Sequence, residues 1–496
     1  GGKVDLFSKT TGLRFEPEAC RTRIRQHLGL SSDARAPGMR LAEPLAPEMA
    51  GSPLARGANF EWASTVVVAD IAEAATQERI AAEIEAFPSE FLLFLPAEID
   101  LVLRVEGGIT RQIKKRMEGN VAIVEDGAFE NRWMLFQKSV TVDDAEAQAD
   151  ATHVQARGEI PLAWAMPLEG REQAGRFWAF FPTETQTHLP GILNAPWKLN
   201  SDRTNLVRGA YNEQLMGLAA GLIASALPSL AMSDDKGAVV AAFPRKLDRQ
   251  DDMAAPLCKA LWDHILTTSL LPDTNGDLHL PSMLSRHAVE DQAVAAAWTL
   301  VARHEARAGL VHPDCYAHKY RISRLESLEA EARKREISMR SKLGFDAWIE
   351  LLASTETLPA KQCLLFIEAV ASQAKRLGIF STFDMEVVPT EDGGLRRPSE
   401  VAISGGPHAL AGIHPVAGAI ASDPDCYRVL VDVFEVMVVS DESWTDILQQ
   451  SLDQARYGED EAAWDDFWHN VLAAPVVDAT AFLEGLGSSA LEFKSM

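Results

Sequence analysis

Hydrophobic and polar positions alternate in short runs over roughly the first 235 residues of the chain. β-Branched and alternating apolar residues predict strands there, over residues 12–15, 64–68, 91–96, 99–105, 121–125, 133–142, 160–166 and 175–181. Pro17 is suited to open a helix, and helical spacing returns over residues 72–87 until Pro88 closes it. Residues 31–58 are rich in Ser, Ala, Pro and Gly, and are predicted to form a loop.

From about residue 245 the spacing of apolar positions becomes helical. Helices are predicted over residues 256–270, 290–308, 322–343, 345–353, 361–377, 426–439 and 443–457. Few strand-like runs remain in this part. The pattern therefore predicts an α+β fold class, with a mixed front part and a mostly helical rear part.

The 18 residues from Leu215 to Met232 carry no charge, which reaches the lower length limit of a membrane span. The run is rich in Ala and Gly, which gain little from lipid, and Pro228 interrupts it. Leu215, Leu222 and Ile223 fall at helical spacing. We predict a buried core helix here in preference to a membrane span.

The rear part contains an internal repeat. Residues 271–282 (LPDTNGDLHLPS) match residues 388–399 (VPTEDGGLRRPS), with Pro, Gly, Leu, Pro and Ser at identical spacing. A second echo, Pro-Asp-Cys-Tyr, begins at Pro313 and again at Pro424. Each copy is expected to hold helices around a small hairpin whose Asn-Gly or Asp-Gly pair makes the tight turn. Two such modules in tandem usually present a binding surface.

Length and charge narrow the class of protein. A chain of 496 residues is too long for one ordinary core, so about two to four domains are expected. The net charge of −24 repels nucleic-acid backbones and anionic membranes. The five cysteines show no metal-knuckle or CxxC spacing, and no secretory signal opens the chain, which fits a cytoplasmic protein with reduced thiols. Because the chain starts at Gly1 and a strand-like run follows at once, we expect that something precedes it.

Several familiar signatures are missing from the sequence: the G-x-x-x-x-G-K-[ST] phosphate loop, the G-x-S-x-G elbow, H-E-x-x-H, and a G-x-G-x-x-G that opens a helix. The informative segment is residues 180–205, FFPTETQTHLPGILNAPWKLNSDRTN. It is predicted to leave a strand, turn at Pro182 and end in Asp202-Arg203 before the uncharged helix. A loop this polar is costly unless it is anchored, and such loops often serve function.

This segment resembles the middle domain of sacsin-like members of the GHKL ATPase superfamily, which are relatives of the heat-shock chaperone ATPases. Those proteins share a pattern of the type FLP…glP…hiNapF…l..DR..l, and Trp197 stands where they usually carry Phe. The similarity is strongest over residues 175–215, and the repeated P-x-x-x-G-x-L-x-x-P-S modules are also similar to repeats downstream in such proteins. The resemblance implies four parts, namely the tail of the ATPase α/β sandwich (1–75), a mixed α/β middle domain (76–240) and two helical modules (241–375 and 376–496).

In that superfamily an N-terminal domain binds ATP and Mg²⁺ through E…N and D-x-G-x-G motifs, and neither motif is present here. The resemblance implies that Arg203 is the catalytic residue and reaches the γ-phosphate when the domains close. A guanidinium offers forked donors that match phosphate oxygens. Asp202 and Asn205 would orient the loop, and the cofactor-contacting set would extend to Asn194 and to Lys3, the latter at the tail of a glycine-rich lid.

The resemblance thus implies an ATP-dependent, chaperone-like switch that acts on a protein client or effector. High Ala and Arg content gives a bacterial character, so stress response or anti-phage defence follows by analogy. Relatives dimerise through N-terminal closure, which implies a homodimer. Two alternatives stay open: a non-catalytic scaffold that binds proteins, and a nucleic-acid-engaging protein that uses residues 319–342. On the residues alone, Asp202-Arg203 also fits an exposed pair that caps the next helix.

Three weaker candidates have ordinary structural explanations. His312, Cys315 and His318 have zinc-ligand spacing, but a helix-start turn with Pro313 at its first position is preferred. Residues 319–342 hold eight Lys or Arg and four Glu, and are interpreted as a solvated, salt-bridged helix. The aromatic residues near Trp464 are predicted to lie on an amphipathic helix that packs on the body.

Overall fold

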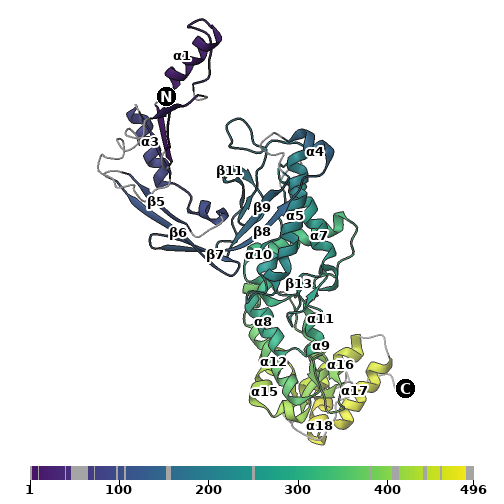
Figure 1. Cartoon of the computed structure of the whole chain (residues 1–496). Helices are drawn as coiled ribbons and strands as arrows, with labels where there is room; N and C mark the ends of the chain where they lie inside the picture. The colour runs from purple at the N-terminus through teal and green to yellow at the C-terminus, as the bar shows by residue number, and fades with distance from the viewer. Residues whose placement is uncertain are drawn as a thin grey trace. The chain divides into compact units, whose positions relative to one another are not determined.

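The computed structural model describes residues 3–8, 11–38, 41–45, 65–71, 73–95, 99–105, 108–151, 158–247, 252–379, 381–404, 413–439, 444–457 and 461–486. Helices and strands are mixed in the front part and helices dominate the rear part, so the α+β fold class is confirmed (Figure 1). The chain divides into two compact units. The first unit holds Gly1–Glu118 and Ala122–Asn131, and the second holds Gly119–Val121 and Arg132–Met496.

The first unit begins with an antiparallel four-stranded sheet of order β3-β2-β1-β4. Its strands are β1 (Val4–Ser8), β2 (Thr11–Phe15), β3 (Glu43–Leu45) and β4 (Thr65–Ala69). Pro17 opens α1 (Pro17–Leu28), as predicted, and Gly29 ends the helix in the left-handed conformation. The loop predicted over residues 31–58 is wrong at β3, because pairing with β2 holds this short segment extended.

The rest of the first unit holds a helix, a 3-10 helix and three strands. Its elements are α3 (Ala74–Glu85), the 3-10 helix η1 (Ser89–Phe94), β5 (Asp100–Arg104), β6 (Thr110–Glu118) and β7 (Val121–Asp126). The strand predicted over residues 91–96 is wrong, because residues 91–94 belong to η1. Leu92 and Leu93 are both buried, and a helical turn can bury neighbouring side chains that a half-exposed strand would place on opposite faces.

The second unit carries five strands in the order β8-β9-β12-β10-β11, of which β8 begins within the last residues of the first unit. They are β8 (Phe129–Val140), β9 (Ile160–Pro167), β10 (Arg176–Ala179), β11 (Phe181–Gln186) and β12 (Ile192–Asn194). The pair β10–β12 is parallel, while β8–β9, β9–β12 and β10–β11 are antiparallel. The helices α4 (Ala145–Asp150) and α5 (Ala210–Ala231) lie beside these strands (Figure 1).

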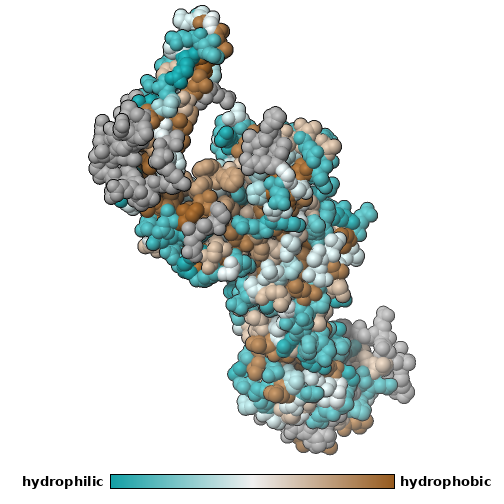
Figure 2. Space-filling view, viewed as in Figure 1, coloured by the Kyte–Doolittle hydropathy of each residue, from teal (hydrophilic) through white to brown (hydrophobic). Residues whose placement is uncertain are grey.

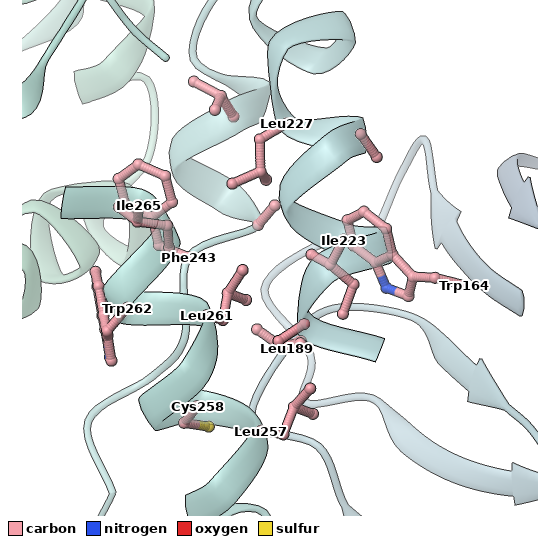
Figure 3. Packing of buried hydrophobic residues seen from close by; sticks show 14 of the residues in the cluster. Trp164, Leu189, Ile223, Leu227, Phe243, Leu257, Cys258, Leu261, Trp262 and Ile265 are labelled. Carbon is pink, nitrogen blue, oxygen red and sulfur yellow. The ribbon is translucent and has the colours of Figure 1, made fainter. Parts of the chain in front are cut away.

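The uncharged run forms α5, as predicted. This helix is long and apolar enough to cross a membrane, alone among the described helices, yet 56% of its most apolar window is buried inside the protein. In Figure 3, Ile223 and Leu227 of α5 face Leu261 and Ile265 of α7 (Ala255–Thr267), with Trp164 of β9 beside α5. The prediction of a buried core helix is therefore confirmed.

Helices dominate the rear part. They are α6 (Ala238–Ala241), α7, α8 (Gln292–Val301), α9 (His304–Arg307), α10 (Lys319–Lys334), α11 (Phe345–Glu350), α12 (Thr357–Ala371), α13 (Ala374–Leu377), α14 (Gly418–Ala421), α15 (Pro424–Asp432), α16 (Trp444–Tyr457), α17 (Glu461–Ala473) and α18 (Val476–Gly485). The predicted helix 290–308 is interrupted between α8 and α9. The predicted helix 322–343 ends early, because Glu336 adopts a left-handed conformation just after α10.

The end of the helix predicted over residues 426–439 is also wrong. Glu435 has a φ of 54°, which ends the helical path after α15. The β-branched residues that follow form β19 (Met437–Val439), which pairs in parallel with β17 (Val401–Ser404). Strand β17 also pairs with β18 (His414–Pro415).

The two halves of the internal repeat fold alike. The first copy forms β13 (Leu271–Pro272), β14 (Leu278–His279) and η2 (Pro281–Met283), and the second forms β15 (Val388–Pro389), β16 (Leu395–Arg396) and η4 (Pro398–Glu400). Gly276 and Gly393 occupy the same turn position, with φ of 91° and 81°, which an L side chain rarely adopts. The predicted hairpin with its tight glycine turn is therefore confirmed in both copies.

Buried apolar side chains of the second unit gather in three clusters. The first runs from Val140 to Ala332 and packs the sheet against α5, α7 and α10, on both sides of the domain boundary expected at residue 240. The second surrounds Trp348 and α12. The third surrounds Phe467 of α17, so the predicted amphipathic helix near Trp464 does pack on the body.

Candidate functional site: the Arg203 loop

Residues 198–207, here called the Arg203 loop, connect β12 to α5, and the two arms of this loop run antiparallel to each other. The main-chain N–H of Val207 donates to the carbonyl of Lys198 at 3.1 Å, and Leu199 pairs with Leu206. Nearer the tip, the Asn200 N–H donates to the carbonyl of Asn205 at 2.9 Å. Main-chain hydrogen bonds therefore join the two arms of the loop both at its base and near its tip.

The base of the Arg203 loop is fixed to α5 by one buried amide. Asn212, only 1% exposed, accepts a hydrogen bond from Lys198 N–H at 2.9 Å. Its Nδ2 donates to the carbonyl oxygens of Lys198 at 2.8 Å and of Val207 at 2.7 Å. A buried amide with three such bonds is satisfied, and losing it would leave the Lys198 N–H without its acceptor and the Val207 carbonyl without its donor.

A second anchor joins the loop base to the end of α4. The Lys198 ammonium donates to the carbonyl of Asp150 at 2.7 Å and contacts its carboxylate. The same carboxylate accepts from the N–H of Tyr211, in the first turn of α5, at 3.2 Å. These hydrogen bonds, with that of Lys198 first, hold the pKa of Asp150 below its usual value. The carboxylate therefore stays charged and ties α4, the loop and α5 together at neutral pH.

The tip of the loop is hydrogen-bonded to the edge strand β11. Asn205 receives a hydrogen bond from Thr185 Oγ1 at 3.2 Å and donates through Nδ2 to Glu184 Oε2 at 3.2 Å. The Glu184 N–H donates to the carbonyl of Thr204 at 2.8 Å. Because Asn205 is occupied by these bonds, its geometry fits a positioning role.

Arg203 lies at this tip. Its side chain is exposed, and it makes no hydrogen bond or ion pair with any residue that the structure describes. Its φ of 62° is a left-handed conformation that a non-glycine residue adopts at a cost. The Arg203 N–H donates to the carbonyl of Asn200 at 3.1 Å, which holds the turn in this shape.

Asp202 binds its own turn and does not cap the next helix. Its Oδ1 accepts from the Thr204 N–H at 3.1 Å and from Thr204 Oγ1 at 2.7 Å. These bonds, that from the Thr204 hydroxyl first, lower the pKa of Asp202 below its usual value. Helix α5 starts only at Ala210, so the alternative of a helix-capping Asp-Arg pair is wrong.

Asn194 stands at the end of β12 and is 5% exposed. Its Oδ1 accepts from the N–H of Phe180 at 2.8 Å and so fixes the turn between β10 and β11. That turn is made at Phe180, with a φ of 64°, whereas Pro182 lies inside β11. The turn predicted at Pro182 is therefore wrong. The turn lies at Phe180, where the side chain of Asn194, fourteen positions later, stabilises it.

Lys3 belongs to the first unit, unlike the other four candidate residues. It stands just before β1, and its Nζ lies 3.4 Å from Asp70 Oδ2 in a partly exposed ion pair. Gly1 and Gly2, also part of the suggested lid, lie outside the described residues. The second unit thus brings together Arg203, Asp202 and Asn205 on one loop, with Asn194 on the neighbouring strand.

The weaker candidates have structural roles. Pro313 opens the 3-10 turn η3 (Pro313–Tyr316), as predicted, and His312 Nδ1 accepts from the Asp314 N–H at 3.2 Å. Cys315 is fully buried, and burial raises its thiol pKa well above the usual value. Within the described part of the chain, no three His, Cys, Asp or Glu side chains come together as a metal site.

Two arginine side chains of the basic stretch 319–342 are buried inside the protein. Arg321 is 3% exposed and binds Asp235, and Arg324 is equally buried. Arg335 binds Asp263 and Glu331. A nucleic-acid surface needs free cations on one face, so this arrangement weighs against that alternative.

Sequence reasoning missed the buried polar groups of the rear part. The carboxylate of Asp235 joins Arg321 and Arg171, from three distant segments. His287, 0% exposed, packs edge-on against both Trp298 and Trp348, which stack on each other, and burial lowers its pKa to about 3. Helical spacing could have placed Arg321 and Arg324 on the inward face beside Leu325 and Leu328, but nothing local identifies their partners.

Comparison with known proteins adds no relative. No protein-family model matches the chain, and searches of curated proteins and of solved structures found no match.

Proposed function

We propose that this chain is part of an ATP-driven, chaperone-like conformational switch of the GHKL type, in which Arg203 contacts the γ-phosphate of a nucleotide held by a separate domain. The observation that carries the proposal is the state of Arg203, an exposed guanidinium without a partner among the described residues, at the tip of a doubly anchored loop. An arginine kept unpaired on a rigid support is suited to meet an incoming anion.

The surrounding residues support this role without touching the nucleotide themselves. Asn205 and Asp202 fix the backbone on either side of Arg203, and Asn194 shapes the neighbouring turn. The left-handed backbone at Arg203 is retained only because these contacts hold it, and such strain often marks functional positions. Rigid support matters because a phosphate contact that is misplaced by about 1 Å loses much of its effect.

ATP and Mg²⁺ would be held mainly by the nucleotide-binding domain. When bound there, the nucleotide supplies the phosphoanhydride whose hydrolysis drives the switch. The chain described here would contribute positive charge at the γ-phosphate as negative charge develops on the leaving side. The tandem modules of the rear part would transmit the resulting closure to a protein client or effector.

The test is ATP turnover by the complete protein carrying Arg203→Ala. We expect kcat to fall about a hundredfold or more, with little change in nucleotide affinity. Arg203→Lys keeps the charge but loses the fork, and should recover only part of the rate. Arg176→Ala removes an exposed arginine of β10 and serves as the control. Unchanged turnover in Arg203→Ala would contradict the proposed contact between Arg203 and the γ-phosphate.

A non-catalytic scaffold is the second candidate, and exposed apolar side chains favour it. Leu472 on α17 and Val476 and Val477 on α18 are 85%, 81% and 78% exposed. On the face drawn in Figure 2, hydrophilic side chains are frequent over the rear helices, with hydrophobic ones scattered among them. If the complete protein hydrolyses no ATP while Leu472→Asp abolishes its self-association or partner binding, the scaffold interpretation replaces the switch.

A further inference from the structure

The outward side of α17 and of the first turn of α18 is apolar. Leu472, Val476 and Val477 are 85%, 81% and 78% exposed, and Trp468 is 42% exposed. The first three are among the five most exposed large apolar side chains that the structure describes. Single exposed apolar side chains are ordinary, but several that lie together usually mark an interaction surface. These four side chains are here called the α17–α18 face.

Folding of the third cluster does not use the α17–α18 face. Phe467, Val471 and Phe482 on the inward side of α17 and α18 are buried in that cluster with residues of α16, and Figure 1 shows the three helices together at the yellow end of the ribbon. Trp468 and Leu472 are four positions apart, so they share the other side of α17. Only two residues separate α17 from α18, which keeps the apolar start of α18 close to the end of α17.

Acidic side chains border the α17–α18 face. Asp465 precedes Trp468 by three positions on α17, and Glu484 follows Val477 by seven positions on α18, so each lies on the same side of its helix as the apolar residue. Both carboxylates are exposed, and neither forms an ion pair with a residue that the structure describes. The sequence has no Lys or Arg over residues 457–493. This segment of the chain therefore combines exposed apolar area with uncompensated negative charge.

This combination decides which occupant fits the α17–α18 face. A second copy of the chain in a two-fold contact would bring the same carboxylates against each other, and an anionic membrane would be repelled by them. A segment that carries both apolar and basic side chains matches both features. A helix presents such side chains well, because apolar residues three or four positions apart form one stripe with Lys or Arg beside it.

We infer that the α17–α18 face binds a basic amphipathic helix of a partner protein. The apolar stripe of that helix covers Leu472, Val476 and Val477, and its Lys or Arg side chains meet Asp465 and Glu484. The inference specifies the chemistry of a partner for these exposed residues. It rests neither on ATP nor on the contact between an arginine and the γ-phosphate, so each proposal can fail without the other.

The experiment measures the affinity of the full chain for a fluorescent synthetic peptide by fluorescence anisotropy. The peptide consists of leucine and lysine, is about 18 residues long and has leucine at helical spacing. A second peptide of the same composition in shuffled order has the same charge but no apolar stripe. We expect the ordered peptide to bind at least tenfold more tightly than the shuffled one, with an affinity that falls as salt is added.

Leu472→Asp separates apolar contact from attraction by charge. The variant should bind the ordered peptide at least tenfold more weakly, although its added negative charge by itself favours a basic peptide. Leu300→Asp adds the same charge at a side chain of α8 that is 82% exposed, and as the matched control it should bind no more weakly than the unaltered protein. Both leucines are exposed, so both variants should keep the Tm of the unaltered protein.

A pair of double variants tests the acidic border. Asp465→Asn with Glu484→Gln should weaken binding of the ordered peptide about threefold and make it less dependent on salt. Glu213→Gln with Glu326→Gln removes the same charge from exposed positions on α5 and α10, and should have a smaller effect. Equal effects of the two double variants would mean that only the overall charge of the chain attracts the peptide, which would overturn the inference.

Other results would also overturn the inference. Equal binding of the ordered and shuffled peptides would show that no apolar stripe is recognised, and so would equal affinities of Leu472→Asp and Leu300→Asp. A dimer in sedimentation that Leu472→Asp dissociates would mean that a second copy covers the α17–α18 face. If Leu491→Ser with Phe493→Ser strengthens peptide binding at least tenfold, the end of the chain itself occupies the face.

Discussion

Different interactions stabilise the second unit and the four-stranded sheet of the first unit. In the second unit, three apolar clusters pack helices against strands and against each other. In the first unit, the four-stranded sheet buries Phe7 and the ion-paired Asp5, while Val67 in the middle of β4 is 61% exposed. Side-chain packing therefore stabilises the second unit, and strand pairing with one ion pair contributes more to this sheet of the first.

This difference in packing affects which part of the molecule can hold a loop in one fixed conformation. The Arg203 loop is fixed to α5, and α5 runs through the largest cluster, with Leu215, Ile223 and Leu230 all 0% exposed. A packed interior has few alternative arrangements, so it can hold a loop in one strained conformation. The comparison is testable, because substitutions should act strongly where packing dominates and weakly where it does not.

The largest effect is expected from Trp298→Ala in the second unit. Trp298 is 0% exposed, stacks on Trp348 with ring centroids 5.7 Å apart, and donates through Nε1 to the carbonyl of Trp348 at 3.0 Å. Removing the ring leaves a cavity and an unpaired carbonyl, so the free energy of unfolding should fall by about 3–5 kcal/mol. Urea unfolding measures it. Leu472→Ala, at a side chain 85% exposed, is the control and should change little; similar midpoints for both variants would contradict the packing argument.

The next effect is a loss of stability in acid that comes from His287. Its Nε2 lies 3.1 Å from the carbonyl of Val311, and its Nδ1 accepts from Trp348 Nε1 at 3.1 Å, so the folded ring is neutral. Burial lowers its pKa to about 3, whereas the unfolded chain takes up the proton near pH 6.5. Between these values the unfolded state binds more protons, so this contribution is complete above pH 6.5 and is lost as pH falls.

The slope approaches about 1.4 kcal/mol per pH unit below the unfolded pKa, which gives a loss of roughly 2 kcal/mol between pH 6.5 and 4.5. Unfolding of the second unit at several pH values measures the slope. His287→Asn cannot titrate, so it should be less stable at pH 7 but show a shallower slope. An unchanged slope in this variant would mean that other groups cause the acid sensitivity.

These contrasts also explain what the sequence could predict. The start of α1, helix α5 and both repeat hairpins were predictable, because Pro17, the apolar spacing of α5 and the turn glycines act within a few residues. The errors fall where a distant segment decides. Pairing with β2 makes β3 a strand, and pairing with β17 makes β19 a strand.

The candidate site divides in the same way. An exposed Arg203 at the end of a polar loop could be predicted from residues 180–205 alone. Its anchors could not, because Asp150 and Lys198 are 48 positions apart and no local pattern pairs them.

In the first unit, Arg14→Met should produce a smaller loss. Arg14 binds Asp5 through two bonds of 2.8 and 2.9 Å, and Asp5 is 3% exposed. Removing the arginine leaves a buried carboxylate unpaired, at a cost of about 1–3 kcal/mol. The hydrogen bond from Arg14 lowers the pKa of Asp5, so the contribution is present above the unfolded pKa near 3.9 and is lost as pH falls through the lowered value.

Urea unfolding at pH 7 and pH 3 measures this effect in the transition of the first unit. The double variant Asp5→Asn with Arg14→Met removes both charges, and should recover part of the stability lost in Arg14→Met. If Arg14→Met is as stable as the unaltered protein at pH 7, the ion pair is not what supports this sheet.

The smallest effect is expected from Val67→Thr in β4. This variant is informative when it is compared with the same substitution at a buried valine. Val67 is 61% exposed, so a hydroxyl there stays in water, and Thr is as well suited to a strand as Val. The free energy of unfolding should change by less than about 0.5 kcal/mol. Val239→Thr makes the same change at a side chain that is 0% exposed in the first cluster, where an unpaired hydroxyl should cost about 1–3 kcal/mol. Because the two substitutions are chemically identical, any difference between them reports the packing around each site. Equal losses would show that β4 is packed as tightly as α6, and the contrast between the two units would then be wrong.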